Sequence, residues 1–222
     1  RYAPKPDIVA QMQAQTDAEF VHSLRLAVGG GLTRAALVLL GRPEATYALG
    51  GPTPRISWQL VDHRGDHVTH QHFELPLVLA IDALVGRVRI IDVNLLPPRE
   101  VAPLNLPNYD DWVLREALHN CVAHQDYAQG GRILVTESPD TLRFFNYGEF
   151  LPGSVDKVLH AAQPEQRYRN ACLANAMVEL DLMETINSGV KGMFRKQRER
   201  FFPLPDYAIE GPPPSVSVTI YG

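Results

Sequence analysis

The sequence predicts an α/β fold in which a mixed sheet is covered by helices on one side. Strand-like and helix-like segments alternate along the chain. The strand-like segments show period-2 alternation, and the helix-like segments have apolar residues at helical spacing. Hydrophobic residues make up 45% and charged residues 21% of the 222 residues, which are ordinary values for a globular protein. The longest unbroken apolar runs, such as residues 35–40, hold about six residues, whereas a membrane-spanning helix needs about 20. The length suits one large domain or two small ones.

The first half of the chain predicts an αβ companion subdomain at 16–95, preceded at 1–15 by a linker or the tail of a missing upstream domain. Thr16 stands in the position of a helix N-cap, with Glu19 at the capping-box position. The expected elements are a helix at 16–28, a buried strand at 35–40, two strands at 55–62 and 67–73 joined by a hairpin turn, and a helix at 75–91.

A proline-rich connection at 96–107 marks the expected internal boundary, and residues 108–222 form the second subdomain. The helix that opens this half is capped by an aspartate at its N-terminus. The expected elements are helices at 110–124, 155–160, 170–180 and 186–200, and strands at 132–137, 141–146 and 215–221.

Charge and cysteine content narrow the class of protein. The formal net charge of −4, from 21 Lys and Arg against 25 Asp and Glu, argues against a globally basic nucleic-acid binder. Residues 191–200 are locally basic, with five basic residues and one acidic residue; a solvated helix face is the common interpretation and nucleic-acid contact the alternative. Cys121 and Cys172 lie in apolar surroundings and indicate buried thiols in a reducing compartment, which predicts a cytoplasmic protein.

Glu116 and Asn120 are the first candidate site residues. On a helix they lie about 40° apart at the margin of an apolar stripe, and His124 continues the row. A carboxylate and an amide at the edge of a core each need a polar partner. A metal ion with phosphates could supply one, since an amide oxygen can ligate Mg²⁺ and a carboxylate can orient a water. The alternative is that both side chains cap or bridge a neighbouring loop.

Two glycine-containing turns provide further candidates. At 187–193 a loop opens a helix, where glycines expose backbone N–H groups to an anion at the positive helix end and a lysine adds a cation. The candidate phosphate-binding residues are Ser188, Gly189, Lys191 and Gly192. An ordinary glycine junction is the alternative interpretation. At Asn146 and Gly148 a strand end runs into a second glycine turn, a pattern that by itself is typical of a turn.

A cluster of four histidines surrounds the predicted hairpin turn: His63, His67, His70 and His72. His70 and His72 share one strand face, because side chains alternate along a strand. Metal ligation is conceivable there, and a solvated strand face is the more common arrangement.

The segment 109–207 resembles the ATP-binding region of RecG-like, helicase-related bacterial transcriptional regulators, often labelled divergent AAA. The matching text is REALHNCVAHQDY, GGRILV, LRFFNYGEFLPGSV and YRNACLANAMVELDLMETINSGVKGMFRKQRERFFPLPDY, and the upstream GLTRAALVLLGRPEA is similar to a connector in the same family. Such proteins typically carry an N-terminal Schlafen/AlbA-like DNA-binding domain, absent here, and often a C-terminal winged helix. The resemblance therefore implies an internal fragment of such a regulator.

Through this resemblance a Bergerat-type ATP-binding sandwich is implied, the class shared by gyrase, heat-shock protein 90, histidine kinases and mismatch-repair ATPases. The N-box helix of that class carries a glutamate and an asparagine, matched by Glu116 as the base for water and Asn120 as the Mg²⁺ ligand. The turn whose aspartate reads the adenine amino group corresponds to Asn146 and Gly148, with asparagine in place of aspartate. The phosphate-binding glycine segment corresponds to 188–192. The implied cofactors are ATP and Mg²⁺.

The leading function is therefore an ATP-binding module, which could also hydrolyse ATP, in a bacterial DNA-linked transcriptional regulator. The alternative is a non-catalytic scaffold with a degenerate nucleotide site that links DNA-binding domains. The missing aspartate favours the scaffold, whereas Glu116 and Asn120 favour the enzyme. The expected partners are a nucleotide and, through domains outside this chain, DNA, with no membrane; a homodimer is compatible with this organisation.

Overall fold

The computed structural model describes residues 10, 13–97, 102–130, 132–162, 167–183 and 189–222. Its main feature is a six-stranded sheet with the strand order β4-β3-β7-β8-β10-β9. Strand β3 pairs with β7 in parallel, and the other neighbouring pairs are antiparallel, so the sheet is mixed, as the sequence predicts. The strands are β3 (Ile56–Val61), β4 (His67–Phe73), β7 (Ile133–Glu137), β8 (Thr141–Tyr147), β9 (Asp206–Glu210) and β10 (Ser215–Tyr221).

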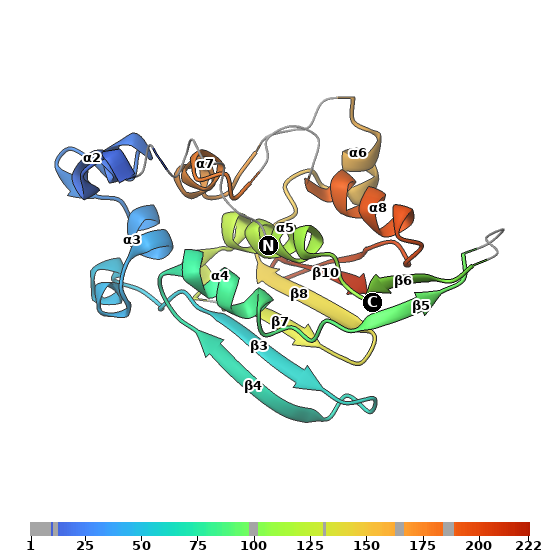
Figure 1. The fold of residues 1–222 in the computed structure, drawn as a ribbon. Helices are drawn as coiled ribbons and strands as arrows, with labels where there is room; N and C mark the ends of the chain where they lie inside the picture. Colours follow the sequence, from blue (N-terminus) through green and yellow to red (C-terminus); the bar gives the residue numbers. More distant parts are fainter. Residues whose placement is uncertain (1–9, 11–12, 98–101, 131, 163–166, 184–188) are drawn as a thin grey trace.

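The helices lie on one side of this sheet (Figure 1). Along β7 and β8, buried and less buried residues alternate, because one face of each strand packs under the helix layer and the other does not. The helices are α2 (Asp17–Ser23), α3 (Arg34–Leu40), α4 (Leu77–Val85), α5 (Asp111–His124), α6 (Val155–His160), α7 (Ala171–Glu179) and α8 (Gly189–Glu199), with 3₁₀ turns η1 (Pro43–Leu49) and η2 (Tyr127–Gln129). The predicted α/β fold with helices on one side of a mixed sheet is confirmed.

The two predicted subdomains contribute strands to the same sheet. Strand β3, from the 16–95 segment, runs beside β7, from the 108–222 segment, in the register Ile56↔Ile133 to Leu60↔Glu137. Between these strands along the chain, β5 (Asp92–Leu95), at the end of the 16–95 segment, pairs antiparallel with β6 (Leu104–Pro107), in the region expected to be a proline-rich connection. The boundary at 96–107 therefore lies between strands that share one core.

The buried carboxylate of Glu137 connects β3 and β7 through hydrogen bonds. Glu137 is almost fully buried; its Oε2 accepts a hydrogen bond of 2.9 Å from Trp58 Nε1, and its Oε1 accepts one of 2.5 Å from Arg89 Nε. The guanidinium of Arg87 lies 4.1 Å from the centre of the Trp58 ring. A buried charge is tolerated when it is paired in this way, so the network joins the two halves of the sheet to the segment after α4.

Several predicted elements are confirmed, and others are wrong. The helices expected at 16–28 and 75–91 end at Ser23 and Val85, and β1 (Ala27–Val28) forms a short strand paired with β2 (Gly31–Leu32). Thr16 and Glu19 form the expected capping box at α2, and Asp110 caps α5. Residues 35–40, predicted as a buried strand, belong to helix α3, whose N-cap Thr33 accepts a hydrogen bond from the Ala36 N–H. A short apolar run does not separate strand from helix by periodicity alone. Strand β9 was not expected, and it forms because it pairs with β10.

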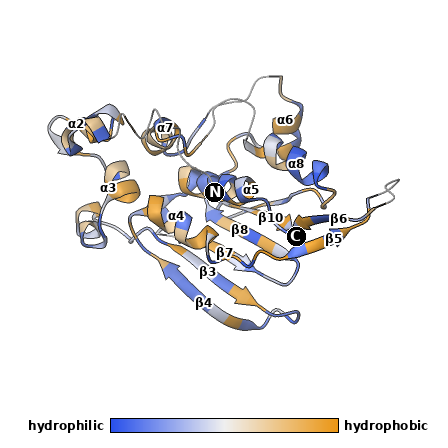
Figure 2. Ribbon diagram, viewed as in Figure 1, coloured by the Kyte–Doolittle hydropathy of each residue, from blue (hydrophilic) through white to orange (hydrophobic). Residues whose placement is uncertain are grey.

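Cys172 is a further correction: it is exposed, whereas Cys121 is buried as predicted. Hydrophobic colouring is concentrated on α4 and the central strands, while β4 is mostly hydrophilic (Figure 2). None of the helices in the described ranges combines the length and apolar character that a bilayer crossing requires.

The contact between α4 and α5 contains a buried histidine beside a paired arginine. Arg115 donates to Asp111 over 2.9 Å and also to Asp82 of α4. One turn further along α5, His119 is 3% exposed, and its Nε2 has no hydrogen-bond partner among the described residues. Burial, with a smaller contribution from Arg115, lowers the pKa of His119 from 6.5 to about 4. The imidazole is therefore neutral in the folded protein at neutral pH.

We expect the stability of the fold to decrease as the pH falls from about 6.5 towards 4. In this window the unfolded chain binds a proton at residue 119 that the folded chain does not, so the free energy of unfolding falls by up to about 1.4 kcal/mol per pH unit. Urea unfolding of the wild type and of His119→Gln at pH 7 and pH 5 measures this loss. The variant retains a smaller dependence, because the pKa of His124 is lowered in the same way. His22→Gln, on exposed helix α2, is the matched control; an unchanged pH dependence in His119→Gln would contradict the assignment.

Candidate nucleotide-binding site

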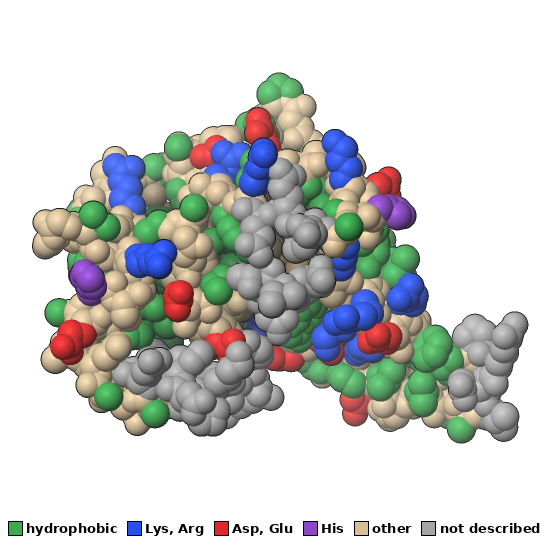
Figure 3. Space-filling model, turned by 90° about the horizontal axis from the view of Figure 1, so that it is seen from above, with side chains coloured by type: hydrophobic (Ala, Val, Ile, Leu, Met, Phe, Trp, Pro, Cys, Tyr) green, Lys and Arg blue, Asp and Glu red, His purple; other side chains and the backbone are tan. Residues whose placement is uncertain are grey.

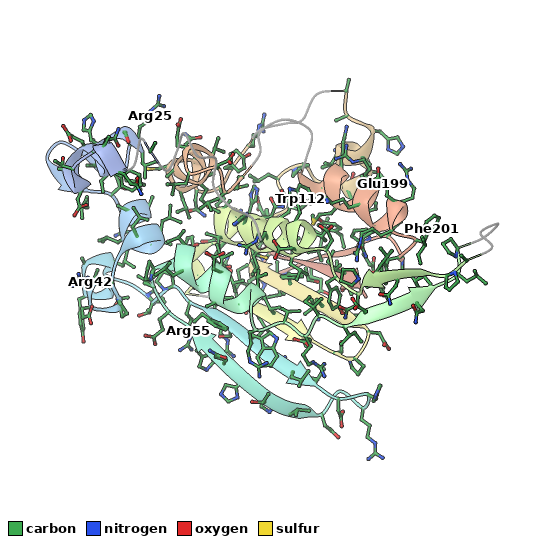
Figure 4. All side chains as sticks on the ribbon, in the orientation of Figure 1. Arg25, Arg42, Arg55, Trp112, Glu199 and Phe201 are labelled. Atoms are coloured by element: carbon green, nitrogen blue, oxygen red, sulfur yellow. The ribbon has the colours of Figure 1, made fainter. Side chains whose placement is uncertain are left out.

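Helix α5 carries a row of side chains that face the segment before α7 and the start of α8. The row consists of Trp112, Glu116, Asn120 and His124, which are spaced four residues apart and therefore share one side of the helix. Trp112 contacts α8, and Figure 4 shows it between α5 and α8. At the other end of the row, the His124 ring lies 5.5 Å from the ring of Tyr168. The row therefore spans the distance between α8 and the chain that leads into α7.

Glu116 and Asn120 form a hydrogen-bonded pair at the centre of this row. The Asn120 Nδ2 donates to Glu116 Oε1 over 3.0 Å, and Glu116 is 5% exposed. A Cβ placed on Gly189, the first residue of α8, would lie 3.6 Å from the same carboxylate oxygen. The carboxylate therefore lies beside the N-terminus of α8, where the helix dipole favours negative charge.

Two tyrosines surround the carboxylate with neutral hydroxyl groups. Burial raises the pKa of both Tyr168 and Tyr207, and the Glu116 charge adds to the shift in each case. The Tyr207 ring is stacked on Phe194 of α8 at a centroid distance of 6.3 Å. Burial, with Arg169 as the second cause, lowers the pKa of His124 to about 4. The site thus holds the Glu116 carboxylate near tyrosine and amide side chains that can donate or accept hydrogen bonds.

The turn after β8 lies against the C-terminal end of α5. Asn146 is 5% exposed and donates from Nδ2 to Tyr147 O over 3.0 Å. Gly148 has a φ of +131°, and a Cβ there would lie 2.7 Å from His124 O and 3.0 Å from Arg169 Nε. Glycine is required at this position because both its backbone conformation and its close approach to α5 exclude a side chain. Gly148 therefore lies at the His124 end of the row, whereas Gly189 lies beside Glu116.

The predicted phosphate-binding residues of α8 are divided between different contacts. Lys191 Nζ donates to Ala161 O, in the chain after α6, over 2.6 Å. A Cβ on Gly192 would lie 2.5 Å from the Trp112 ring, so this glycine allows α8 to pack closely on α5. Gly189 lies beside Glu116, while Ser188 lies outside the described residues. Of the predicted set, the structure brings together Glu116, Asn120 and Gly189.

Residues just after α5 attach the strand-end turn to the helix, and the sequence interpretation did not include them. The Tyr147 N–H donates to Gln125 Oε1 over 3.1 Å, and the Asp126 N–H donates to Tyr147 O over 2.8 Å. The Asn170 side chain donates to Gln125 O over 2.8 Å. The sequence AHQDY contains a sign of these contacts, because a buried polar residue directly after a helix, here Gln125, requires a hydrogen-bond partner.

No three His, Cys, Asp or Glu side chains in the described ranges are arranged to hold a metal ion on their own. A divalent cation at Asn120 would therefore need further oxygen ligands from phosphates or water, which is the usual way in which Mg²⁺ is bound beside a nucleotide. The chemistry of Asn120 fits this role. Its Nδ2 donates to Glu116, so its Oδ1 is the amide atom that could ligate the cation.

Comparison with known proteins shows which part of the chain has recognisable relatives. Residues 130–220, which run from just before β7 into β10, match the model of a family described as "Putative ATP-dependent DNA helicase recG C-terminal". The curated proteins gave no match. The structure is similar to the crystal structure of the DIP2311 protein from Corynebacterium diphtheriae, with a TM-score of 0.75 and 19% identity. That similarity covers 99% of this chain and 45% of the solved chain.

At this identity the solved structure shows the shared fold, and the chain spans less than half the length of that protein. The family match excludes α5 and its polar row, since it begins at residue 130. Together, the mixed sheet under a helix layer and the family match are consistent with the Bergerat-type sandwich that the sequence resemblance implies. Residues 130–220 are thus similar to a RecG-like, ATPase-related family.

Proposed function

We propose that this chain is a nucleotide-binding module that binds ATP with Mg²⁺ along the polar row of α5. The observation that carries the proposal is the buried pair of Glu116 and Asn120 beside the N-terminus of α8, in a chain whose residues 130–220 are similar to an ATPase-related family. A carboxylate beside a helix N-terminus, hydrogen-bonded to an amide whose oxygen can ligate Mg²⁺, is compatible with a nearby divalent cation.

The phosphate end of the proposed site lies at the start of α8. Backbone N–H groups at a helix N-terminus bind anions, and Lys191 supplies a cation in the same turn. Asn120 is the proposed Mg²⁺ ligand through its amide oxygen. Glu116, whose carboxylate the Asn120 amide orients, is the proposed base that accepts a proton from the attacking water.

The base end of the proposed site lies at the other end of the row, at Asn146 and Gly148. Gly148 approaches α5 closely at His124 O, and the buried Asn146 side chain lies two residues before it in the same strand end. An amide replaces the aspartate that the resemblance leads one to expect, so Asn146 recognises the base without a charge.

The proposed module belongs to a bacterial, cytoplasmic, DNA-linked regulator, as the sequence resemblance implies, and DNA contacts belong to parts of that regulator outside this chain. Seen from the helix side, Lys and Arg side chains are spread among acidic and hydrophobic ones (Figure 3), and the net charge is −4. A binding surface that releases many counterions requires several cationic contacts to phosphates.

A non-catalytic scaffold that links DNA-binding domains is the second candidate. It is favoured by one observation, the asparagine at position 146 in place of an aspartate. The two candidates differ in whether the carboxylate of Glu116 performs chemistry.

Glu116→Gln and Asn120→Ala should have different effects, one on ATP turnover and the other on Mg²⁺-dependent binding, although the two side chains are hydrogen-bonded to each other. The glutamine keeps a hydrogen-bond acceptor for Asn120 and removes the base, so ATP turnover should fall by about 10²–10⁴-fold while ATP binding is retained. Asn120→Ala removes the proposed metal ligand, so Mg²⁺-dependent binding should be lost. Phosphate release and nucleotide titration measure the two effects. Equal turnover in the wild type and Glu116→Gln would exclude Glu116 as the base and favour the scaffold.

Lys191→Ala should weaken ATP binding by about 1–3 kcal/mol, the scale of a charge-assisted hydrogen bond. Arg198→Ala is the matched control, because Arg198 is an exposed cation on the same helix. Fluorescence titration of both variants with ATP measures the difference. If the two variants bind ATP equally well, the Lys191 side chain serves its contact with Ala161 O and not the phosphates.

A further inference from the structure

The edge strand β4 carries a stripe of exposed histidines on the sheet face that the helices leave uncovered. Trp58 of β3 points into the core, so its neighbours in β3, Ser57 and Gln59, point to the other face. These two residues pair with His72 and His70, respectively. Both histidines are exposed, and they therefore lie side by side on the uncovered face.

A β-bulge adds His67 to the same stripe. Simple alternation would place residues 67 and 70 on opposite faces. The register shifts between Leu60 and Val61, so that Thr69 pairs with Leu60 but His67 pairs with Val61. The extra residue in β4 turns His67 towards its neighbours, and its ring centroid lies 5.2 Å from that of His70. The rings of His70 and His72 are also 5.2 Å apart.

This spacing is the one that chelation of a single ion requires. Two imidazoles that bind a tetrahedral ion through nitrogens at about 2.0–2.1 Å have ring centroids about 5 Å apart. His70 meets this condition with both of its neighbours. Because the three histidines do not converge on one point, one pair at a time would hold the ion and water would complete its coordination.

His72 is held in an orientation that suits a metal ligand. Its Nδ1 is hydrogen-bonded to the buried Ser57 hydroxyl over 2.9 Å, which leaves Nε2 as the nitrogen for a metal; such a second contact orients metal-binding histidines.

We propose that His70 and His72 form a surface chelating site for a divalent transition-metal ion of the zinc class, with His67 as the alternative partner of His70. Imidazole suits Zn²⁺ and related ions, whereas Mg²⁺ prefers oxygen ligands. The site lies on β4, outside the α5 row, and is independent of the nucleotide.

Calorimetric titration of the intact chain with ZnCl₂, and separately with MgCl₂, tests this site through a graded series of variants. His70→Gln removes the histidine shared by both pairs and should weaken Zn²⁺ binding by at least about tenfold, the scale of a lost metal-site contact. His72→Gln should weaken it less, because the pair of His67 and His70 remains, and His67→Gln should have the smallest effect of the three. MgCl₂ should give no saturable binding that depends on His70.

Two controls separate this site from other zinc ligands. His63→Gln alters an exposed histidine in the turn before β4, and Cys172→Ser alters an exposed thiol; both should bind Zn²⁺ as the wild type does. Urea unfolding of each histidine variant in the absence of metal shows that the fold is intact. Unchanged Zn²⁺ affinity in His70→Gln would overturn the proposal, as would a loss in His63→Gln equal to that in His70→Gln.

Discussion

The buried carboxylate of Glu116 is the constraint on which the arrangement of α5, α8 and β9 depends. A charge removed from water requires compensating contacts, and these contacts come from separate parts of the chain. Asn120 donates a hydrogen bond from the next turn of the same helix. The N-terminus of α8 lies beside the carboxylate at Gly189, and the pKa of Tyr207, on β9, is raised in part by this charge. A ligand that brings a cation to this point would therefore act on all of these elements together.

Glycines determine how closely the elements around α5 approach one another. Gly192 allows α8 to lie against Trp112, and Gly148 allows the strand-end turn to lie against the last carbonyl groups of α5. Interiors are close-packed, so a side chain at either position would separate the layers and move the ends of the polar row. The same residues that resemble phosphate- and base-binding glycines thus have a packing role that the contacts show directly.

Local features of the sequence predict much of the fold but less of the site. The caps at Thr16 and Asp110 predict helix starts because the side chain and its backbone partner are three residues apart. The contact of Glu116 with Asn120 likewise follows from helical spacing. Helix α3 was predicted as a strand because its apolar run was read without the Thr33 cap, and β9 exists through pairing with a later strand. The approach of Gly189 and Tyr168 to α5 joins residues far apart along the chain, which no local pattern specifies.

The central claim is that the α5 row binds a nucleotide with a divalent cation. Isothermal titration calorimetry of the unmodified chain with ATP, with and without Mg²⁺, tests it most directly. The account predicts saturable binding with one ATP per chain that is tighter when Mg²⁺ is present, because Asn120 and the phosphates would share the ion. The absence of saturable binding in both titrations would contradict the claim and leave Glu116 and Asn120 as structural partners of α8.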